Sequence, residues 1–316
     1  MSPMTEVEGR KLALSNLDKV LYPATGTTKG EVLHYVATTA GALLAHVHDR
    51  PMSFLRFPDG VEGERFFAKN PPPGKPAWVK TMEVRRSEGV VARQVLVADL
   101  STLMWAANLV VEFHVPQWRA ESPGVADRLV LDLDPGEPAT VVECCAVALW
   151  LRERLAADGL GAWVKTSGSK GLHVLVPLEP TPSEEVSAYA KALAVEAEAE
   201  LPGLVVHRMK RALRGGKVFV DFSQNSAAKT TAAPYTLRAR REPTVSTPVT
   251  WEEVADAVRR SGSGAGGGSG PGGSGAGGGS LVFRVEDIAV RLERYGDLLG
   301  PLLNPNRAGA LPRGRG

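Results

Sequence analysis

An apolar strand that ends in two carboxylates constrains this chain more than any other segment. The apolar run 129–131 leads directly into Asp132-Leu133-Asp134, and a Pro-Gly pair closes the segment. Because alternate side chains of a strand share one face, the two carboxylates project together while the intervening leucines face a core. Two like charges held this close favour a bound cation, and hard divalent metals take oxygen ligands. The segment therefore predicts a metal site at a strand end, although Asp-Pro-Gly is equally typical of an ordinary turn.

The composition is that of a globular protein. The chain has 316 residues, of which 43% are hydrophobic and 23% charged, so it can bury a sizeable core in one large domain or two smaller ones. The N-terminus lacks the apolar stretch of a signal peptide, and no run approaches the roughly 18 apolar residues of a membrane helix. We therefore expect a cytoplasmic protein without a membrane partner. The adjacent Cys144 and Cys145 suit neither a disulfide framework nor a cysteine-based zinc site.

Basic residues are concentrated in two places, although the net charge is only +2. One group lies within 207–217, and Arg238, Arg240 and Arg241 form the other. Such clusters fit contact with phosphate or nucleic acid, and a solvated charged face is the alternative.

Strand and helix patterns alternate along the chain, which predicts an α/β or α+β fold. Besides the strand that ends in the two carboxylates, we expect helices at 29–45, 101–111, 139–158 and 183–201, and strands at 51–57, 89–97, 162–166, 172–177 and 217–222. The segment 261–280 is almost wholly glycine and serine and is expected to be a flexible insert. Beyond it, apolar residues at spacings of three and four from Val285 to Leu299 predict an amphipathic helix within 281–303 that belongs to the same domain. The tail 304–316, rich in Pro, Gly and Arg, is expected to be disordered.

A small-residue turn between two strands is a candidate phosphate site. In Thr166-Ser167-Gly168-Ser169-Lys170-Gly171-Leu172-His173, consecutive backbone N–H groups can cradle phosphate oxygens. Ser169 would add a donor, Lys170 a point charge, and His173 would reach in from the next strand. The spacing differs from that of a Walker loop, and a plain hairpin turn is the alternative.

Two further strings bear on the carboxylate pair. Asp221 ends the apolar strand 217–222 and would complete a three-carboxylate site with Asp132 and Asp134, unless a nearby Arg or Lys pairs with it instead. Phe66 and Phe67 are flanked by cations and form a candidate stacking platform for single-stranded template. Because buried phenylalanines are common, we expect at least one of the two rings to point inward.

Together these strings resemble the polymerase domain of the bacterial ligase D of non-homologous end joining, a branch of the archaeo-eukaryotic primase superfamily. The resemblance covers nearly the whole chain, including Asn16 to Pro23, His114 to Trp118, Leu131 to Gly136, Thr166 to His173, Lys217 to Asn225 and Pro234 to Arg238. It implies a primase-like fold with mixed or antiparallel central sheets flanked by helices, and catalytic acids on adjacent strands. It also implies one domain over 1–304, with a DNA-end-binding part at about 1–120 and a catalytic core at about 121–260.

The resemblance assigns roles to individual residues. It implies that Asp132, Asp134 and Asp221 are catalytic and hold two divalent ions, with Mn²⁺ favoured and Mg²⁺ possible. It places Ser167, Ser169, Lys170, His173 and His114 at the incoming NTP or dNTP. It places Lys19 and Lys29 at a 5′-phosphate, Phe66 and Phe67 on the template, Arg238 near primer and template, and a further cation at Arg56.

The implied function is nucleotidyl transfer onto DNA 3′ ends at gaps or breaks, with ribonucleotides preferred. A DNA primase and a non-catalytic module that binds 5′-phosphorylated DNA ends are the alternatives. Because no ligase lysine motif is visible, we expect a stand-alone paralogue. The resemblance implies a monomer, with Ku and a separate ligase as candidate partners.

Overall fold

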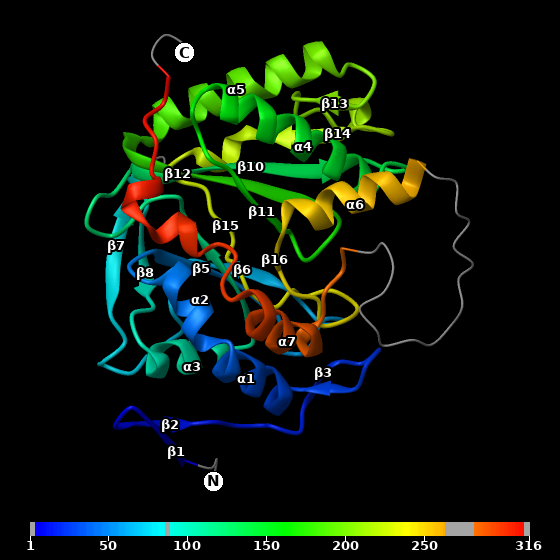
Figure 1. Ribbon diagram of the computed structural model, residues 1–316. Coiled ribbons are helices and arrows are strands. Elements are labelled where there is room, and N and C mark those ends of the chain that lie inside the picture. Colours follow the sequence, from blue (N-terminus) through cyan, green and yellow to red (C-terminus); the bar gives the residue numbers. More distant parts are fainter. Residues whose placement is uncertain (1–3, 86–88, 263–280, 313–316) are drawn as a thin grey trace.

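The computed structural model describes residues 4–85, 89–262 and 281–312 (Figure 1). Most of the expected glycine- and serine-rich insert, 263–280, lies outside the described residues. The helices are α1 (Lys29–Thr38), α2 (Ala40–Val47), α3 (Leu100–Asn108), α4 (Val141–Ala157), α5 (Ser183–Glu200), α6 (Trp251–Gly262) and α7 (Val285–Tyr295), with 3₁₀ turns η2 (Arg211–Leu213), η3 (Phe222–Asn225), η4 (Gly300–Leu303) and η5 (Pro305–Arg307). In these three ranges no helix is long and apolar enough to cross a bilayer.

The strands form two large sheets and two small hairpins. They are β1 (Met4–Val7), β2 (Arg10–Ala13), β3 (Val20–Tyr22), β4 (Thr27–Thr28), β5 (Pro51–Arg56), β6 (Phe66–Ala68), β7 (Thr81–Arg85), β8 (Val91–Leu96), β9 (Val111–Val115), β10 (Val125–Pro135), β11 (Trp163–Thr166), β12 (Leu172–Pro182), β13 (Val205–Val206), β14 (Val218–Asp221), β15 (Thr231–Ala232) and β16 (Pro248–Val249). The first sheet has the order β13-β14-β10-β12-β11-β16, and the second has the order β15-β9-β5-β8-β7 with β6 paired to β5. Apart from the parallel pair β13–β14, the ladders of both sheets are antiparallel.

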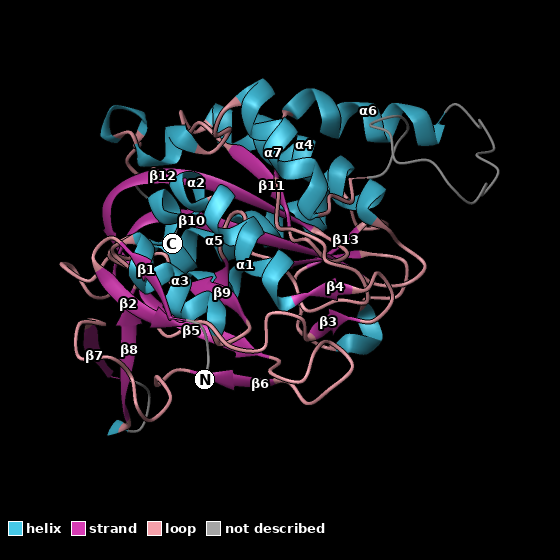
Figure 2. Ribbon diagram, turned by 90° about the horizontal axis from the view of Figure 1, so that it is seen from below, coloured by secondary structure: helices cyan, strands magenta, loops and turns pink. Residues whose placement is uncertain are grey.

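The two sheets lie between two groups of helices. In Figure 1, α4 and α5 lie above the first sheet, and α1, α2 and α3 lie below the second. Helix α6 packs against α4. Figure 2, seen from below, shows the second group of helices in front of the strands. One face of each sheet is therefore packed against helices, and the other is directed toward the opposite sheet. The mixed fold with antiparallel sheets flanked by helices is confirmed.

The helix-covered face of the first sheet is apolar, as the alternation in β10 predicts. Leu129, Leu131 and Leu133 are fully buried in one cluster with residues of α4 and α5. Val218 and Val220 of β14 belong to the same cluster. Since side chains alternate along each strand, Asp132, Asp134 and Asp221 lie on the opposite face.

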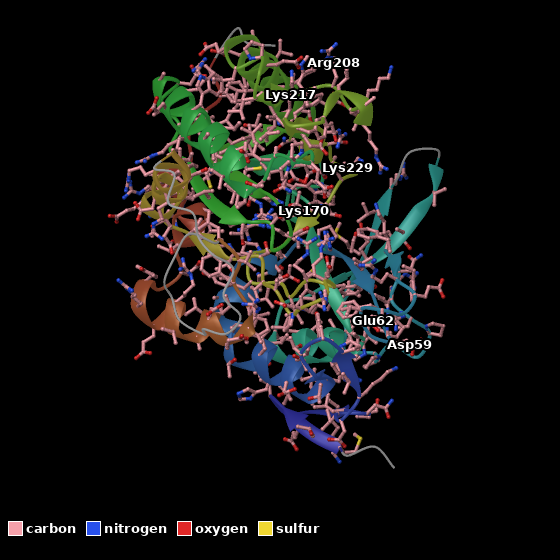
Figure 3. The ribbon with its side chains drawn as sticks, turned by 90° about the vertical axis from the view of Figure 1, so that its right-hand side faces the viewer. Asp59, Glu62, Lys170, Arg208, Lys217 and Lys229 are labelled. Atoms are coloured by element: carbon pink, nitrogen blue, oxygen red, sulfur yellow. The ribbon has the colours of Figure 1, made fainter. Side chains whose placement is uncertain are left out.

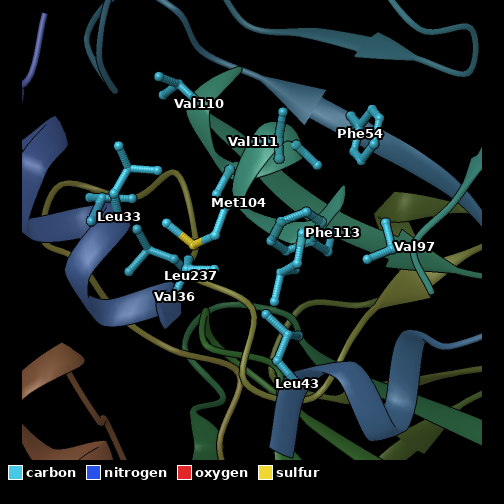
Figure 4. Packing of buried hydrophobic residues seen from close by; sticks show 14 of the residues in the cluster. Leu33, Val36, Leu43, Phe54, Val97, Met104, Val110, Val111, Phe113 and Leu237 are labelled. Carbon is cyan, nitrogen blue, oxygen red and sulfur yellow. The ribbon is translucent and has the colours of Figure 1, made fainter. Parts of the chain in front are cut away.

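A second core fills the space between the second sheet and helices α1 to α3 (Figure 4). Phe54 of β5 and Phe113 of β9 pack edge to face with ring centres 6.1 Å apart. Leu33 of α1 and Leu43 of α2 belong to this cluster, and Leu237 joins it from the chain that follows β15. Burial of these side chains fixes the helices against β5 and β9.

The single helix expected at 29–45 is wrong, because the chain forms α1 and α2 with a break at Thr39. The hydroxyl groups of Thr38 and Thr39 both donate to the carbonyl oxygen of Tyr35, at 2.9 and 2.8 Å. Threonine hydroxyls that bond back to a preceding turn compete with regular helix geometry. The break turns α2 so that Leu43 and Val47 reach the core.

Three other element boundaries differ from expectation. The helix expected at 101–111 ends at Asn108, and Val110 takes a φ of 57° before strand β9 starts. The strand expected at 172–177 continues to Pro182 because β10, after a register shift, pairs again with Thr181 and Pro182. The C-terminal helix ends at Tyr295, where Gly296 takes a φ of 62°, so Leu299 lies beyond it.

The prediction that the tail 304–316 is disordered is wrong for its described part, 304–312. Pro305–Arg307 forms a 3₁₀ turn, and Gly309 pairs with the edge of β12. Its amide donates to the Pro177 carbonyl at 3.1 Å, and its carbonyl accepts from the Glu179 amide at 3.0 Å. Backbone pairing to a strand edge therefore orders a segment whose composition is typical of disorder.

Candidate active site

Four ionisable side chains form a row across the first sheet. In the antiparallel register, Asp132 of β10 is directly opposite Asp221 of β14 on one side and His173 of β12 on the other. His173 is in turn opposite Lys165 of β11. Directly opposite residues point to the same face, so the row lies on the side of the sheet that faces away from α4 and α5. Asp134, two residues after Asp132, belongs to the same face.

The carboxylates of Asp132, Asp134 and Asp221 repel one another. Burial raises the pKa of Asp132 well above its usual range, and the charges of Asp134 and Asp221 raise it further. Burial and the charge of Asp221 also raise the pKa of Asp134. His173 Nε2 lies 3.3 Å from Asp132 Oδ1, but burial and the nearby charge of Lys165 lower the pKa of this histidine well below its ordinary value. The imidazole therefore offers Asp132 little positive charge at neutral pH.

Asp221 is held by its own loop. Its Oδ1 accepts hydrogen bonds from the amide and the hydroxyl of Ser223, at 2.9 and 2.6 Å, and its Oδ2 accepts one from Gln224 Nε2 at 2.9 Å. Among the residues that the structure describes, no three His, Cys, Asp or Glu side chains are already gathered as a metal-binding group. The donor set nevertheless fits divalent metals, because the repulsion between Asp132, Asp134 and Asp221 is relieved by a cation and carboxylate oxygens are hard ligands.

The turn 167–171 lies beside this row and is braced by its first serine. Ser167 Oγ accepts hydrogen bonds from the amides of Ser169 and Gly171, at 3.2 and 3.1 Å. Two of the amides that were expected to cradle phosphate are therefore occupied by a side chain. Lys170 is exposed and pairs with Glu137 at 2.6 Å, so its ammonium group lies outside the cavity that Ser167 and Ser169 help to line.

The opposite wall of the site comes from the second sheet and is organised by Glu112. This buried carboxylate lies 3.0 Å from His114 Nε2 and accepts hydrogen bonds from Arg238 Nε at 2.9 Å and the Ala239 amide at 2.6 Å. Arg238 also donates to the carbonyl oxygen of Ser167, which ties this wall to the turn. His114 and Arg238 are thus fixed on the side of the site that faces the acids.

The two walls enclose an open cavity of about 190 Å³. Asp132, Asp134 and His173 line it from the first sheet, and His114 lines it from the second. Arg238 lines it as well. One cavity thus collects most of the residues that the sequence predicts for catalysis and nucleotide contact.

The aromatic pair lies at the edge of the second sheet, next to this cavity. Phe66 and Phe67 are both exposed, at 40% and 49%, so the expectation that one ring points inward is wrong. They belong to β6, a strand of only three residues that pairs with β5. The Phe67 ring centre lies 5.4 Å from that of His114, and the Arg56 guanidinium lies 5.3 Å from the Phe66 ring.

Lys19 and Lys29 are brought together by the β3–β4 hairpin. The Lys29 amide donates to the Lys19 carbonyl at 2.8 Å. Lys29 Nζ donates to the Ser15 carbonyl at 2.9 Å, and burial together with the charge of Lys19 lowers the pKa of Lys29. Lys19 Nζ contacts Asp59 at 2.8 Å. The two lysines are thus adjacent, and neither lines the cavity.

Figure 3 labels six charged side chains on one face of the molecule. Lys170, Arg208, Lys217 and Lys229 lie in its upper half, and Asp59 and Glu62 lie in its lower half. The cations come from the turn of the first sheet, the basic segment 207–217 and the loop before β15. Two of these cations are paired with acids, Lys170 with Glu137 and Arg208 with Glu198.

Comparison with known proteins agrees with this geometry. A model of the LigD primase-polymerase domain matches residues 28–263. The chain belongs to the LigD primase-polymerase family. Over 296 residues it is 41% identical to the multifunctional non-homologous end joining protein LigD of Mycolicibacterium smegmatis, covering 92% of this chain and 36% of that protein. Over 251 residues it is 30% identical to the bifunctional LigD of Bacillus subtilis, covering 78% of this chain and 40% of that protein.

The fold agrees as well. The polymerase domain of Mycobacterium tuberculosis ligase D, solved in complex with DNA, superposes with a TM-score of 0.81 at 39% identity, covering 92% of this chain and 98% of that one. The chain spans a little over a third of the length of the mycobacterial LigD proteins. LigD primase-polymerase domains are nucleotidyltransferases that depend on metal ions.

Sequence reasoning missed several residues of the LigD-type cavity. Gln224, Thr230 and Thr231 line it, and none of them belongs to a recognisable metal or phosphate motif. Arg240 also lines it and was predicted only as part of a basic group. A signal for Glu112 was present, because it lies two residues before His114 in a strand and therefore shares its face.

We expect Glu112→Gln to destabilise the protein in a pH-dependent way. Burial alone would raise the pKa of Glu112, but the hydrogen bond from His114 and the charge of Arg238 outweigh it and lower the pKa to about 2. Ionised Glu112 therefore stabilises the fold above about pH 4.5, and this contribution disappears as the pH falls toward 2. The loss should be about 3 kcal/mol at pH 7 and smaller at pH 3.5, measured by denaturant unfolding. Glu83→Gln, at an exposed pair with Arg93, is the control, and an equal loss at both pH values would contradict the assignment.

Proposed function

We propose that this chain catalyses template-directed nucleotidyl transfer onto a DNA 3′ end, filling gaps and extending ends at breaks. The observation that carries the proposal is the acid pair Asp132 and Asp134 of β10, which faces His114 and Arg238 over a shared cavity. Asp221 of β14 lies directly opposite Asp132 in the sheet. Acids on one wall and cations on the other suit a substrate whose triphosphate requires both metal ions and positive side chains. Membership of the LigD primase-polymerase family supports this assignment.

Asp132, Asp134 and Asp221 would hold two divalent ions, with Mn²⁺ favoured over Mg²⁺. When bound, such ions lower the pKa of the primer 3′-hydroxyl and neutralise charge on the leaving pyrophosphate. The chain itself orients the substrate. Arg238, fixed by Glu112, supplies positive charge at the cavity, and the hairpin turn 167–171 closes one side of it.

The DNA would be held outside this cavity by the two peripheral sites. The exposed rings of Phe66 and Phe67 offer stacking surfaces to template bases beside His114. Lys19 and Lys29 would bind the 5′-phosphate on the far side of a gap. We further propose a preference for ribonucleotides, a monomeric state, and cooperation with Ku and a ligase activity in non-homologous end joining, the process named for the LigD relatives.

Primer extension on a gapped duplex tests the function. The protein is incubated with Mn²⁺, labelled primer and either NTP or dNTP, and the products are resolved by length. Extension supports the proposal, whereas binding of DNA ends without extension would assign the chain to a non-catalytic end-binding module. Synthesis from a template that carries no primer would assign it to primases instead.

We expect Lys29→Met to remove the preference for a 5′-phosphorylated gap. One charged contact to phosphate contributes about 1.5 kcal/mol, so the ratio of extension on 5′-phosphate and 5′-hydroxyl substrates should fall by about 10-fold. Lys191→Met, on the exposed face of α5, is the matched control and should keep the parental ratio. An unchanged ratio in Lys29→Met would remove this lysine from the phosphate site.

A further inference from the structure

A buried chain of hydrogen bonds connects the two sheets and ends at the cavity. Arg128 of β10 donates from Nε to Gln117 Oε1 at 2.8 Å, and Gln117 Nε2 donates to Thr231 Oγ1 at 3.0 Å. The three residues are only 3%, 1% and 6% exposed. Gln117 follows β9, and Thr231 belongs to β15, where it lines the cavity. The chain therefore runs from the strand of the acids to the opposite wall.

The direction of this chain is fixed by chemistry. A guanidinium group can only donate hydrogen bonds, so the Gln117 atom that faces Arg128 must be the carbonyl oxygen. The amide nitrogen of Gln117 then faces Thr231, and the Thr231 oxygen must accept. The Thr231 hydroxyl is consequently free to donate a hydrogen bond, and no group in the described parts of the chain accepts it.

We propose that Thr231 donates this proton to a phosphate oxygen of the incoming nucleotide, and that Gln117 and Arg128 are positioning residues that enforce the donor state. The proposal rests on the nucleotidyl-transfer function given above and adds a nucleotide contact to it. Phosphate oxygens only accept hydrogen bonds. The Thr231 hydroxyl can only donate one, because its oxygen already accepts from Gln117, so the two groups are complementary. The match is independent of the base, as a template-directed enzyme requires.

Gln117→Glu reverses the direction of the chain with almost no change in shape. One carboxylate oxygen still accepts from Arg128, now as a charged pair, while the other accepts the Thr231 proton and withdraws it from the cavity. The variant should therefore fold at least as stably as the parent. Loss of a hydrogen bond to a charged oxygen should raise the KM for nucleotide about 10-fold, with a smaller change in kcat.

The test is steady-state primer extension with ATP and dATP, together with equilibrium binding of a fluorescent ATP analogue and thermal unfolding. Thr231→Val removes the hydroxyl and should raise KM and Kd to the same degree as Gln117→Glu. Thr231→Ser retains the hydroxyl and should stay within about 2-fold of the parent. Adding Gln117→Glu to Thr231→Val should have no further effect, because both changes remove the same contact.

Several outcomes would overturn the proposal. Parental KM and Kd in Thr231→Val would exclude a nucleotide contact. A full additional loss from Gln117→Glu in the Thr231→Val background would show that its negative charge acts by itself. A defect confined to ATP would place the acceptor on the ribose 2′-hydroxyl rather than on phosphate. Failure of the proposed function is separate, since it would appear as absence of extension by the parent, and the binding measurement still compares the variants in that case.

Discussion

Asp132→Asn is expected to lower the rate of primer extension on the order of 1,000-fold and to raise the free energy of unfolding. The carboxylate lies between Asp221 and His173 in the sheet register and close to Asp134. Burial and the charges of Asp134 and Asp221 raise its pKa, so in the absence of metal ions its ionised form opposes folding at neutral pH. The amide keeps the shape of the side chain but loses the charge that a divalent ion requires.

The sign of the stability effect follows from linkage. A carboxyl group whose pKa is raised on folding destabilises the folded state above that pKa, and the penalty disappears as the pH falls. The unfolding midpoint of Asp132→Asn in EDTA should therefore exceed that of the parent at pH 7.5, and the difference should shrink in acid. Asp256→Asn, at an exposed pair on α6, is the control for both assays.

Asp221→Asn separates the two effects. It should lose extension as Asp132→Asn does, because both acids face the same site. It should not gain stability, because the Asp221 carboxylate accepts hydrogen bonds from Ser223 and Gln224 that an amide cannot fully replace. Near-parental extension by either variant with Mn²⁺ would remove the acids from catalysis.

Gly171→Ala is expected to lower the free energy of unfolding by about 3 kcal/mol or more and to reduce extension by about 100-fold. A Cβ at Gly171 would lie 1.9 Å from the carbonyl oxygen of Leu133. This contact is with backbone, so relief requires β10 and β12 to move apart. Leu133 lies between Asp132 and Asp134, and its displacement would also disturb the spacing of the acids.

Gly41→Ala provides the matched comparison. Gly41 lies within α2, and a Cβ added there meets no atom within 4 Å. Gly41 is in the first turn of α2, so alanine there should stabilise the protein by up to about 0.5 kcal/mol and leave extension unchanged. Denaturant unfolding and primer extension measure both variants. If Gly171→Ala were as stable as the parent, the hairpin would accommodate the added Cβ without loss of stability.

The local pattern of each strand was sufficient to predict which side chains share a face. Asp132 and Asp134 lie together, with Leu133 buried behind them, because the pleat of a strand is set within the strand itself. The candidate site was also predicted in its main parts, since His114, Ser167, His173 and Arg238 all line the cavity with the two acids. Their functional roles remain predictions.

The local sequence pattern did not predict features that depend on contacts with distant segments of the chain. Both rings of the Phe66-Phe67 pair are exposed because β6 lies at a sheet edge, and no residue near them in sequence encodes that position. The segment around Gly309 is ordered because β12 offers it an unpaired edge. Lys170 was expected at the nucleotide, but Glu137, which is distant in sequence, pairs with it outside the cavity.

The sequence by itself therefore determined an acid pair on an apolar strand, a small-residue turn and a group of basic residues, while the strand that carries His114 was not predicted. Only the tertiary structure decided that Asp221 lies opposite Asp132 and that Gln117 connects Arg128 to Thr231. The physical reason is that side-chain alternation is a property of one strand, whereas register and sheet spacing arise from pairing between strands far apart in the chain.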